Sequence, residues 1–195
     1  MSCRAYIAFF ASLSHVMKAS YKSISWVFGD QLNSNHSWYK DHDVSRLFII
    51  AELPQETSYC NHHVQKVAAF FAAMKNFADS LQESGHEVLY LTLDETNDFK
   101  DFHELIQHML EQFSAKFFCY QRPDEYRLLN QLRSFNFADH IEVKEFDSEH
   151  FLFPFDQIER DFVSKKSHRM ESFYRRMRKG FNILMDGSEP KGGAW

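Results

Sequence analysis

Ile-Ser-Trp-Val-Phe-Gly-Asp-Gln-Leu, residues 24–32, is the stretch of this chain that best indicates its fold. The apolar run 24–28 predicts a buried strand, because β-branched and aromatic side chains favour strands. Gly29 ends that run, and Asp30 and Gln31 then supply an acid and an amide. In open parallel sheets, ligands bind in the crevice outside the carboxyl ends of the strands. The tetrapeptide 29–32 is therefore either a ligand-binding turn or an ordinary polar turn after a strand.

Strand and helix patterns alternate along the chain to about residue 149. Short apolar and β-branched runs predict strands at 23–28, 46–52, 87–93, 116–120 and 141–145. Apolar residues at three- and four-residue spacing predict a helix over 64–81, which stops before Gly85. Further helices are predicted over 99–113 and after Pro123. This order predicts an α/β fold with a doubly wound, mostly parallel five-stranded sheet and right-handed connections.

The pattern changes near residue 150, which divides the chain into three predicted regions. Residues 1–21 form an N-terminal extension, 22–149 the α/β domain, and 150–195 a linker. Within the linker, Ser167 is predicted to cap a basic helix that ends at Gly180. The final Gly-Gly-Ala-Trp is typical of a chain that continues, so the linker is expected to lead into a further domain. Residues 1–16 only faintly resemble a signal peptide, since their apolar core is short.

Charge and cysteine content restrict the classes of function. The net charge of −5 argues against a nucleic-acid-binding surface over the whole chain. Residues 160–180 carry eight Lys/Arg and two acidic residues, which indicates either a contact with an acidic surface or a solvated helix face. Three scattered cysteines and the adjacent pair His62-His63 match no zinc spacing, so no metal site is expected. The chain is expected in a reducing cytoplasm, with no membrane span.

The common phosphate-binding and nucleophile motifs are absent from the sequence. There is no G-x-G-x-x-G, no G-x-x-x-x-G-K-[ST] and no G-x-S-x-G. The residues expected at the carboxyl edge of the sheet are instead polar and aromatic, which suits the binding of a flat heterocyclic ligand. The alternative is that these residues solvate a loop and pack a helix. The candidate residues are Asp30, Gln31, Glu52, Glu56, Tyr59 and Phe70.

Several motifs together resemble one protein family. They are Phe28-Gly-Asp-Gln-Leu32, Glu56-Thr-Ser-Tyr-Cys-Asn-His-His63, Lys66-Val-Ala-Ala-Phe-Phe-Ala-Ala-Met74, Arg122-Pro-Asp-Glu-Tyr-Arg127, and Met170-Glu-Ser-Phe-Tyr-Arg-Arg-Met-Arg178. Their order and spacing resemble the N-terminal part of the deoxyribodipyrimidine photolyase-related proteins. This is the bacterial photolyase/cryptochrome branch that includes (6-4) photolyases with an iron–sulfur cluster. The resemblance covers roughly residues 22–195.

The resemblance implies a partner domain and a cofactor for this region. Full-length relatives join an α/β antenna domain to a helical domain that holds FAD, the iron–sulfur cluster and the pocket for damaged DNA. The chain is too short for that helical domain, so catalysis by the chain alone is not expected. In relatives the α/β domain binds 6,7-dimethyl-8-ribityllumazine. By motif, the implied contacts are Gly29, Asp30, Gln31, Glu52, Glu56 and Tyr59, with Phe70 lining the pocket.

Two hypotheses for function follow. In the first, the chain is the antenna-binding part of a light-dependent DNA repair enzyme or a cryptochrome-like photoreceptor. In the second, it is a stand-alone α/β nucleotide-binding or interaction module without photochemistry. In the first hypothesis the resemblance also implies that the Phe70 ring narrows the antenna site, and that the basic helix packs at the junction with the helical domain.

Overall fold

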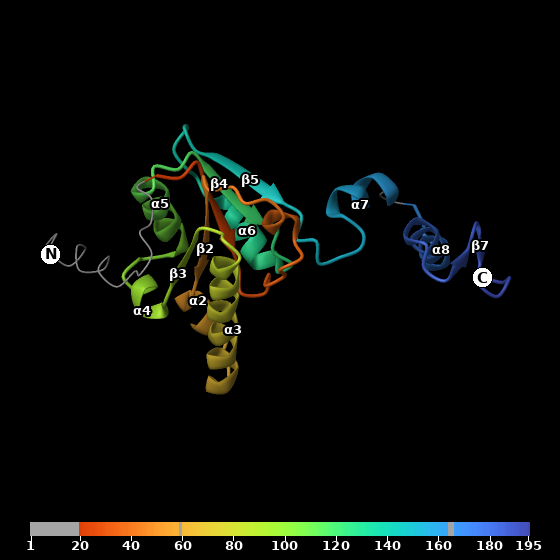
Figure 1. Cartoon of the computed structure of the whole chain (residues 1–195), viewed down its shortest axis with the longest axis horizontal. Helices are drawn as coiled ribbons and strands as arrows, with labels where there is room; N and C mark the ends of the chain where they lie inside the picture. The colour runs from red at the N-terminus through yellow and green to blue at the C-terminus, as the bar shows by residue number, and fades with distance from the viewer. Residues whose placement is uncertain (1–19, 59, 164–165) are drawn as a thin grey trace, which may run out of the picture. The chain divides into compact units, whose positions relative to one another are not determined.

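The computed structural model describes residues 20–58, 60–163 and 166–195. The chain divides into two compact units, the first ending at His150 and the second running from Phe151 to Trp195 (Figure 1). Most of the predicted N-terminal extension, residues 1–19, lies outside the described residues.

The first unit is built on a five-stranded sheet in which every neighbouring pair of strands is parallel. The strand order is β3-β2-β1-β4-β5, and all pairs run in the same direction. The strands are β1 (Ser23–Val27), β2 (Arg46–Ala51), β3 (Val88–Leu91), β4 (Phe117–Gln121) and β5 (Glu142–Phe146). The α/β doubly wound fold predicted from the sequence is confirmed.

The two faces of the sheet are covered by different connections. One buried cluster joins Val27 and Phe48 to Trp38 of η2 (Ser37–Tyr39) and to α3 (Val64–Glu83). The other joins Trp26 and Phe118 to α5 (Phe102–Gln112) and α6 (Tyr126–Ser134). Since the connection after β1 and the one after β4 lie on opposite faces, the chain changes direction between these two neighbouring strands. That switch point is where doubly wound sheets open a ligand crevice.

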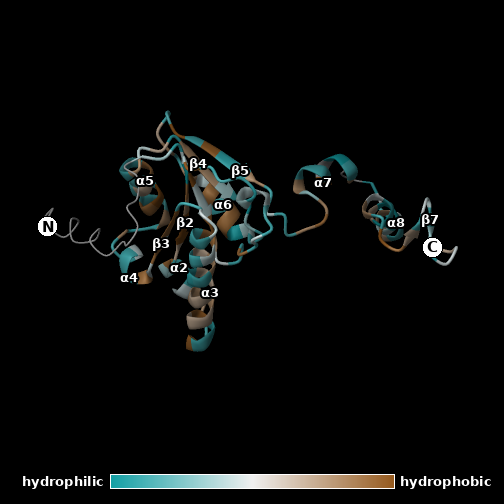
Figure 2. Ribbon diagram, viewed as in Figure 1, coloured by the Kyte–Doolittle hydropathy of each residue, from teal (hydrophilic) through white to brown (hydrophobic). Residues whose placement is uncertain are grey.

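Helix α3 packs on the sheet with only part of its length. His63 caps its first turn by accepting a hydrogen bond from the Gln65 amide at 3.2 Å, and Gly85, with φ of 90°, follows its last turn. Its buried residues, Met74, Ala78 and Leu81, all lie in the C-terminal half. Figure 2 shows apolar residues also on the N-terminal part of α3, which extends beyond the strands. The N-terminal half of α3 has no fully buried residue and can therefore line a cavity at the edge of the sheet.

The other helices of the first unit are short or begin later than the sequence predicts. Helix α5 starts at Phe102 rather than at residue 99, because the Asp101 side chain caps it by accepting from the Glu104 amide at 2.9 Å. The structure adds α2 (Pro54–Ser58), directly after β2, and α4 (Leu93–Thr96), after β3. A one-turn helix is too short for apolar periodicity to reveal it.

The second unit contains α7 (Phe155–Asp161), α8 (Met170–Phe181) and a hairpin of β6 (Met185–Asp186) and β7 (Glu189–Pro190). Its small core is made of Phe153, Phe162 and Phe173, whose rings lie 5.3 to 5.9 Å apart. Within the described part of the chain, no helix is long and apolar enough to cross a membrane.

Two predicted boundaries of the basic helix were wrong. Arg169, not Ser167, is the N-cap of α8, and it makes no side-chain capping bond. The helix passes through Gly180 and ends at Phe181, because Asn182 takes the left-handed conformation with φ of 54°. The Arg178 guanidinium then donates hydrogen bonds to the carbonyl oxygens of residues 183 and 184, which satisfies acceptors just past the helix end.

His86 is expected to make the first unit less stable in mild acid. It is buried, and its ring stacks on that of His42 with centroids 4.6 Å apart. Burial lowers the pKa of His86, and the charges of His42 and Arg46 lower it further. A hydrogen bond with the Tyr39 backbone acts in the opposite direction. The unfolded chain therefore binds this proton at a higher pH than the folded chain does. The free energy of unfolding should fall as pH drops below about 6.5, the ordinary pKa of histidine.

Thermal melting between about pH 7.5 and pH 5.5 checks this, because histidine is the side chain that normally titrates there. His86→Phe should lose less melting temperature over that interval than the parent chain. His140→Phe, at an exposed histidine, should behave like the parent. An equal loss in parent and His86→Phe would contradict the prediction.

Candidate functional site

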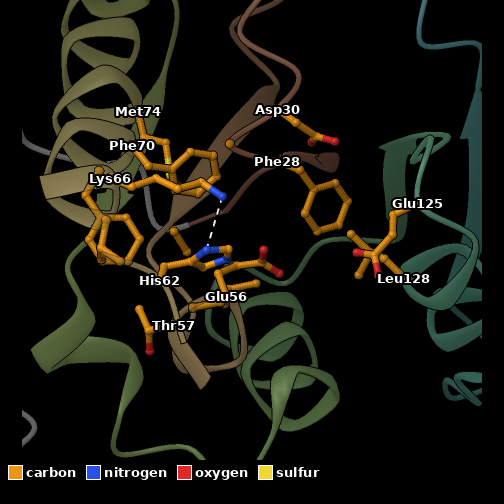
Figure 3. A pocket seen from close by; sticks show the side chains of 15 residues that line it. Phe28, Asp30, Glu56, Thr57, His62, Lys66, Phe70, Met74, Glu125 and Leu128 are labelled. Atoms are coloured by element: carbon orange, nitrogen blue, oxygen red, sulfur yellow. Dashed lines mark hydrogen bonds between the residues drawn. The ribbon is translucent and has the colours of Figure 1, made fainter. Parts of the chain in front are cut away.

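A cavity of about 300 Å³ lies at the carboxyl edge of the sheet. Its walls come from the ends of β1 and β2, from α2, from the N-terminal half of α3 and from the start of α6 (Figure 3). It thus lies at the switch point between β1 and β4. The lining residues are Phe28, Gly29, Asp30, Ala51, Leu53, Glu56, Thr57, His62, Lys66, Val67, Phe70, Phe71, Met74, Glu125 and Leu128.

Gly29 allows α3 to approach the end of β1 closely. A Cβ atom at this position would lie 2.3 Å from Cζ of Phe70 and 2.7 Å from Sδ of Met74. Only a residue without a side chain leaves room for both. The Phe70 ring therefore lies against the Gly29 backbone and forms one wall of the cavity, while Phe28 enters from the end of β1 (Figure 3).

The rim of the cavity carries a cluster of carboxyl groups. Asp30 is exposed there, yet the cavity walls remove part of its water and so raise its pKa, and the charges of Asp124 and Glu125 raise it further. Its own backbone amide and His150 act in the opposite direction. Loss of water also raises the pKa of Glu56, and the charges of Glu125 and Asp30 add to this effect. A carboxylate raises the pKa of another group in this way only when the two lie close together.

Two basic groups that also line the cavity, Lys66 and His62, were not among the residues predicted from the sequence. Lys66 Nζ lies 3.1 Å from Nδ1 of His62, and both side chains come from the region where α3 begins (Figure 3). His62 precedes the N-cap of α3 and Lys66 lies in its first turn, so helical periodicity alone could not have indicated the pair. The exposed thiol of Cys60 lies 3.0 Å from Nε2 of the same histidine.

Gln31 does not line the cavity. It is fully buried, its Oε1 accepts from the Phe28 amide at 3.2 Å, and its Nε2 donates to the carbonyl of Gln121 at 3.1 Å. The side chain thus joins the end of β1 to the end of β4. It holds the turn that carries Asp30.

Glu52 does not line the cavity either. Its carboxylate accepts from the Tyr90 hydroxyl at 2.5 Å and from the Leu93 amide at 2.8 Å. These bonds join the end of β2 to β3 and to the start of α4. Burial raises the pKa of Tyr90, and the hydrogen bond to the Glu52 carboxylate and the charge of that carboxylate raise it further.

The structure brings together four of the seven residues predicted from the sequence: Gly29, Asp30, Glu56 and Phe70 line one cavity. Gln31 and Glu52 support the strand ends beside it, and Tyr59 lies outside the described residues. The arrangement joins apolar and aromatic walls to a polar rim, which is how proteins hold flat small molecules. That these residues bind a chromophore stays a prediction.

Comparison with known proteins relates most of this chain to one family. A family model described as deoxyribodipyrimidine photo-lyase-related protein matches residues 25–195. A (6-4) photolyase of Agrobacterium fabrum is 29% identical over 170 residues, which are 87% of this chain and 34% of that protein. An uncharacterized protein of Acanthamoeba polyphaga mimivirus is 25% identical over 183 residues, covering 89% of this chain and 90% of that protein. The chain thus spans about a third of the photolyase and most of the viral protein. Since the family model covers most of its length, the chain belongs to the deoxyribodipyrimidine photo-lyase-related proteins.

Proposed function

We propose that this chain binds an antenna chromophore, as the α/β part of a light-dependent DNA photolyase or a cryptochrome-like protein. The observation that carries the proposal is the cavity at the β1/β4 switch point, with Phe70 as an aromatic wall and Asp30 and Glu56 at its rim. Family membership supports it, because the related (6-4) photolyase is named for light-dependent chemistry. Cysteine usage favours a cytoplasmic location.

The residues present suit a ribityllumazine. Its flat ring matches the Phe28 and Phe70 surfaces, and its polyol tail offers hydroxyl donors to the carboxylates of Asp30 and Glu56. The cavity, at about 300 Å³, is at the lower end of the range for small-molecule sites. Gln31 and Glu52 would act indirectly, by holding the strand ends. A bound lumazine would supply absorption of violet light, which is what an antenna contributes.

We place the repair chemistry in a helical domain of a full-length protein. This chain spans about a third of the related photolyase, and that domain would hold FAD, an iron–sulfur cluster and the damaged DNA. Helix α8 offers it a mixed surface, with Met170 and Tyr174 exposed beside basic residues. An apolar stripe on a basic helix suits packing between domains.

Absorption spectroscopy tests the antenna proposal. The purified chain should absorb near the violet edge and fluoresce, either as isolated or after addition of 6,7-dimethyl-8-ribityllumazine. A protein that stays colourless after addition and dialysis would contradict the proposal. The chain would then be better explained as an interaction module.

Phe70→Ile is expected to strengthen lumazine binding. The Phe70 ring fills the space above Gly29, so a smaller side chain enlarges a cavity that is near the lower size limit. We expect about a tenfold lower dissociation constant, the usual size of an effect of one or two carbon groups in a pocket. Fluorescence titration measures it, and Phe77→Ile, on the same helix but outside the cavity, is the matched control. Weaker binding by Phe70→Ile would mean that the ring holds the ligand instead of limiting it.

A further inference from the structure

The charge of the cavity indicates which form of a chromophore it accepts. Three elements each bring a carboxyl group to it: Asp30 follows β1, Glu56 lies in α2, and Glu125 precedes α6. The charge of Glu125 helps to raise the pKa of Asp30, and the charges of Glu125 and Asp30 help to raise the pKa of Glu56, so the three groups lie near one another. The cavity therefore has an acidic side built from separate parts of the chain.

This acidic side is only partly neutralised. Glu125 forms an ion pair with Arg127, whose Nε lies 2.7 Å from its Oε1. In the described part of the chain, no ion pair joins Asp30 or Glu56 to a cation within 4.0 Å. Lys66 also lines the cavity, and its Nζ lies 3.1 Å from Nδ1 of His62.

Two features commonly bind phosphate in proteins, the N-terminus of a helix and a glycine-rich loop, and neither has its usual form at α6 or at Gly29. Helix N-termini attract phosphate, but the N-cap of α6 is the acidic residue Glu125, whose side chain makes no capping bond and pairs with Arg127. Gly29 serves the close approach of Phe70 and does not belong to a glycine-rich loop. A phosphate ester in this cavity would lie near three carboxyl groups, against one lysine and one histidine.

We infer that the cavity takes an uncharged chromophore with hydroxyl or N–H donors and rejects the phosphate ester of the same chromophore. The inference rests on the proposed antenna function and adds a determinant of ligand specificity to it. Asp30 and Glu56 are the specificity-determining residues, since they accept hydrogen bonds from a polyol and repel a phosphate.

A matched pair of ligands tests the inference. Fluorescence titration should give at least about tenfold tighter binding for 6,7-dimethyl-8-ribityllumazine than for its 5′-phosphate, equivalent to about 1.4 kcal/mol. Equal binding, or tighter binding of the phosphate through Lys66 and His62, would overturn the inference and leave the antenna function standing. Failure of both ligands to bind would overturn the proposed function, and the inference with it.

Charge-neutral variants identify the residues responsible. Asp30→Asn and Glu56→Gln keep size and hydrogen bonding, so each should still bind lumazine, while the preference over the phosphate falls about three- to tenfold because one repelling charge is removed. Asp94→Asn removes an exposed charge from α4, outside the cavity, and should leave the preference unchanged. An unchanged preference in both cavity variants would overturn the assignment.

Discussion

Trp26→Ala is expected to lower the free energy of unfolding of the first unit by about 3–5 kcal/mol, the usual cost of removing a large buried ring. Trp26 has no exposed surface and lies on β1, the middle strand of the sheet. Its ring meets that of Phe102 edge to face, with centroids 5.0 Å apart, so it joins the sheet to α5. Urea denaturation followed by circular dichroism measures the loss.

Two companion variants make this prediction specific. Among the described residues, the indole N–H of Trp26 has no hydrogen-bond partner. Trp26→Phe should therefore cost less than about 1.5 kcal/mol, since it keeps an aromatic ring and removes an unsatisfied donor. Trp195→Ala makes the same change as Trp26→Ala at a residue 41% exposed in the second unit, and should leave the first unit unchanged. A loss below about 1 kcal/mol for Trp26→Ala would contradict the packing described above.

Gln31→Met is expected to cost about 2–4 kcal/mol of unfolding free energy. The change keeps the length of the side chain but leaves the Phe28 amide and the Gln121 carbonyl without their buried partner. Since this amide also fixes the turn that carries Asp30, we expect weaker lumazine binding in the same variant.

Gln82→Met is the matched control, because Gln82 is exposed and its Nε2 donates one hydrogen bond, to the Val88 carbonyl at 2.9 Å. It should cost less than about 1 kcal/mol. Chemical denaturation of both variants under one set of conditions gives the comparison. Similar costs for the two would mean that the Gln31 bonds contribute no more than a surface contact.

The sheet could be predicted because its strands are continuous apolar runs. Residues 47–51 of β2 are all buried, as strands covered on both faces require. Helix α3 could be predicted from periodicity and from Gly85 after it. The N-cap of α8 was predicted wrongly, because a serine near a helix start is only a tendency and Arg169 occupies that position without a capping bond.

The site was harder to predict, because polar side chains choose partners that are distant in sequence. Gln31 is bonded to a carbonyl 90 positions along the chain, and Glu52 to a hydroxyl 38 positions along. Both lie where a ligand contact would be expected, yet both have structural partners. Glu125, conversely, reaches the cavity only because β4, which precedes α6, lies next to β1 in the sheet. Residue type and local spacing carry no information on such pairings.

The division of α3 into two halves has an evolutionary consequence. Met74, Ala78 and Leu81 hold the helix on the sheet, while Phe70 and Lys66 face the cavity from the part that extends beyond the strands. Lys66 is exposed, so a substitution there changes the lining of the cavity without removing a core contact, whereas Phe70 also packs against the core. The lining of the cavity can therefore change along a lineage at such a position while the scaffold stays constant.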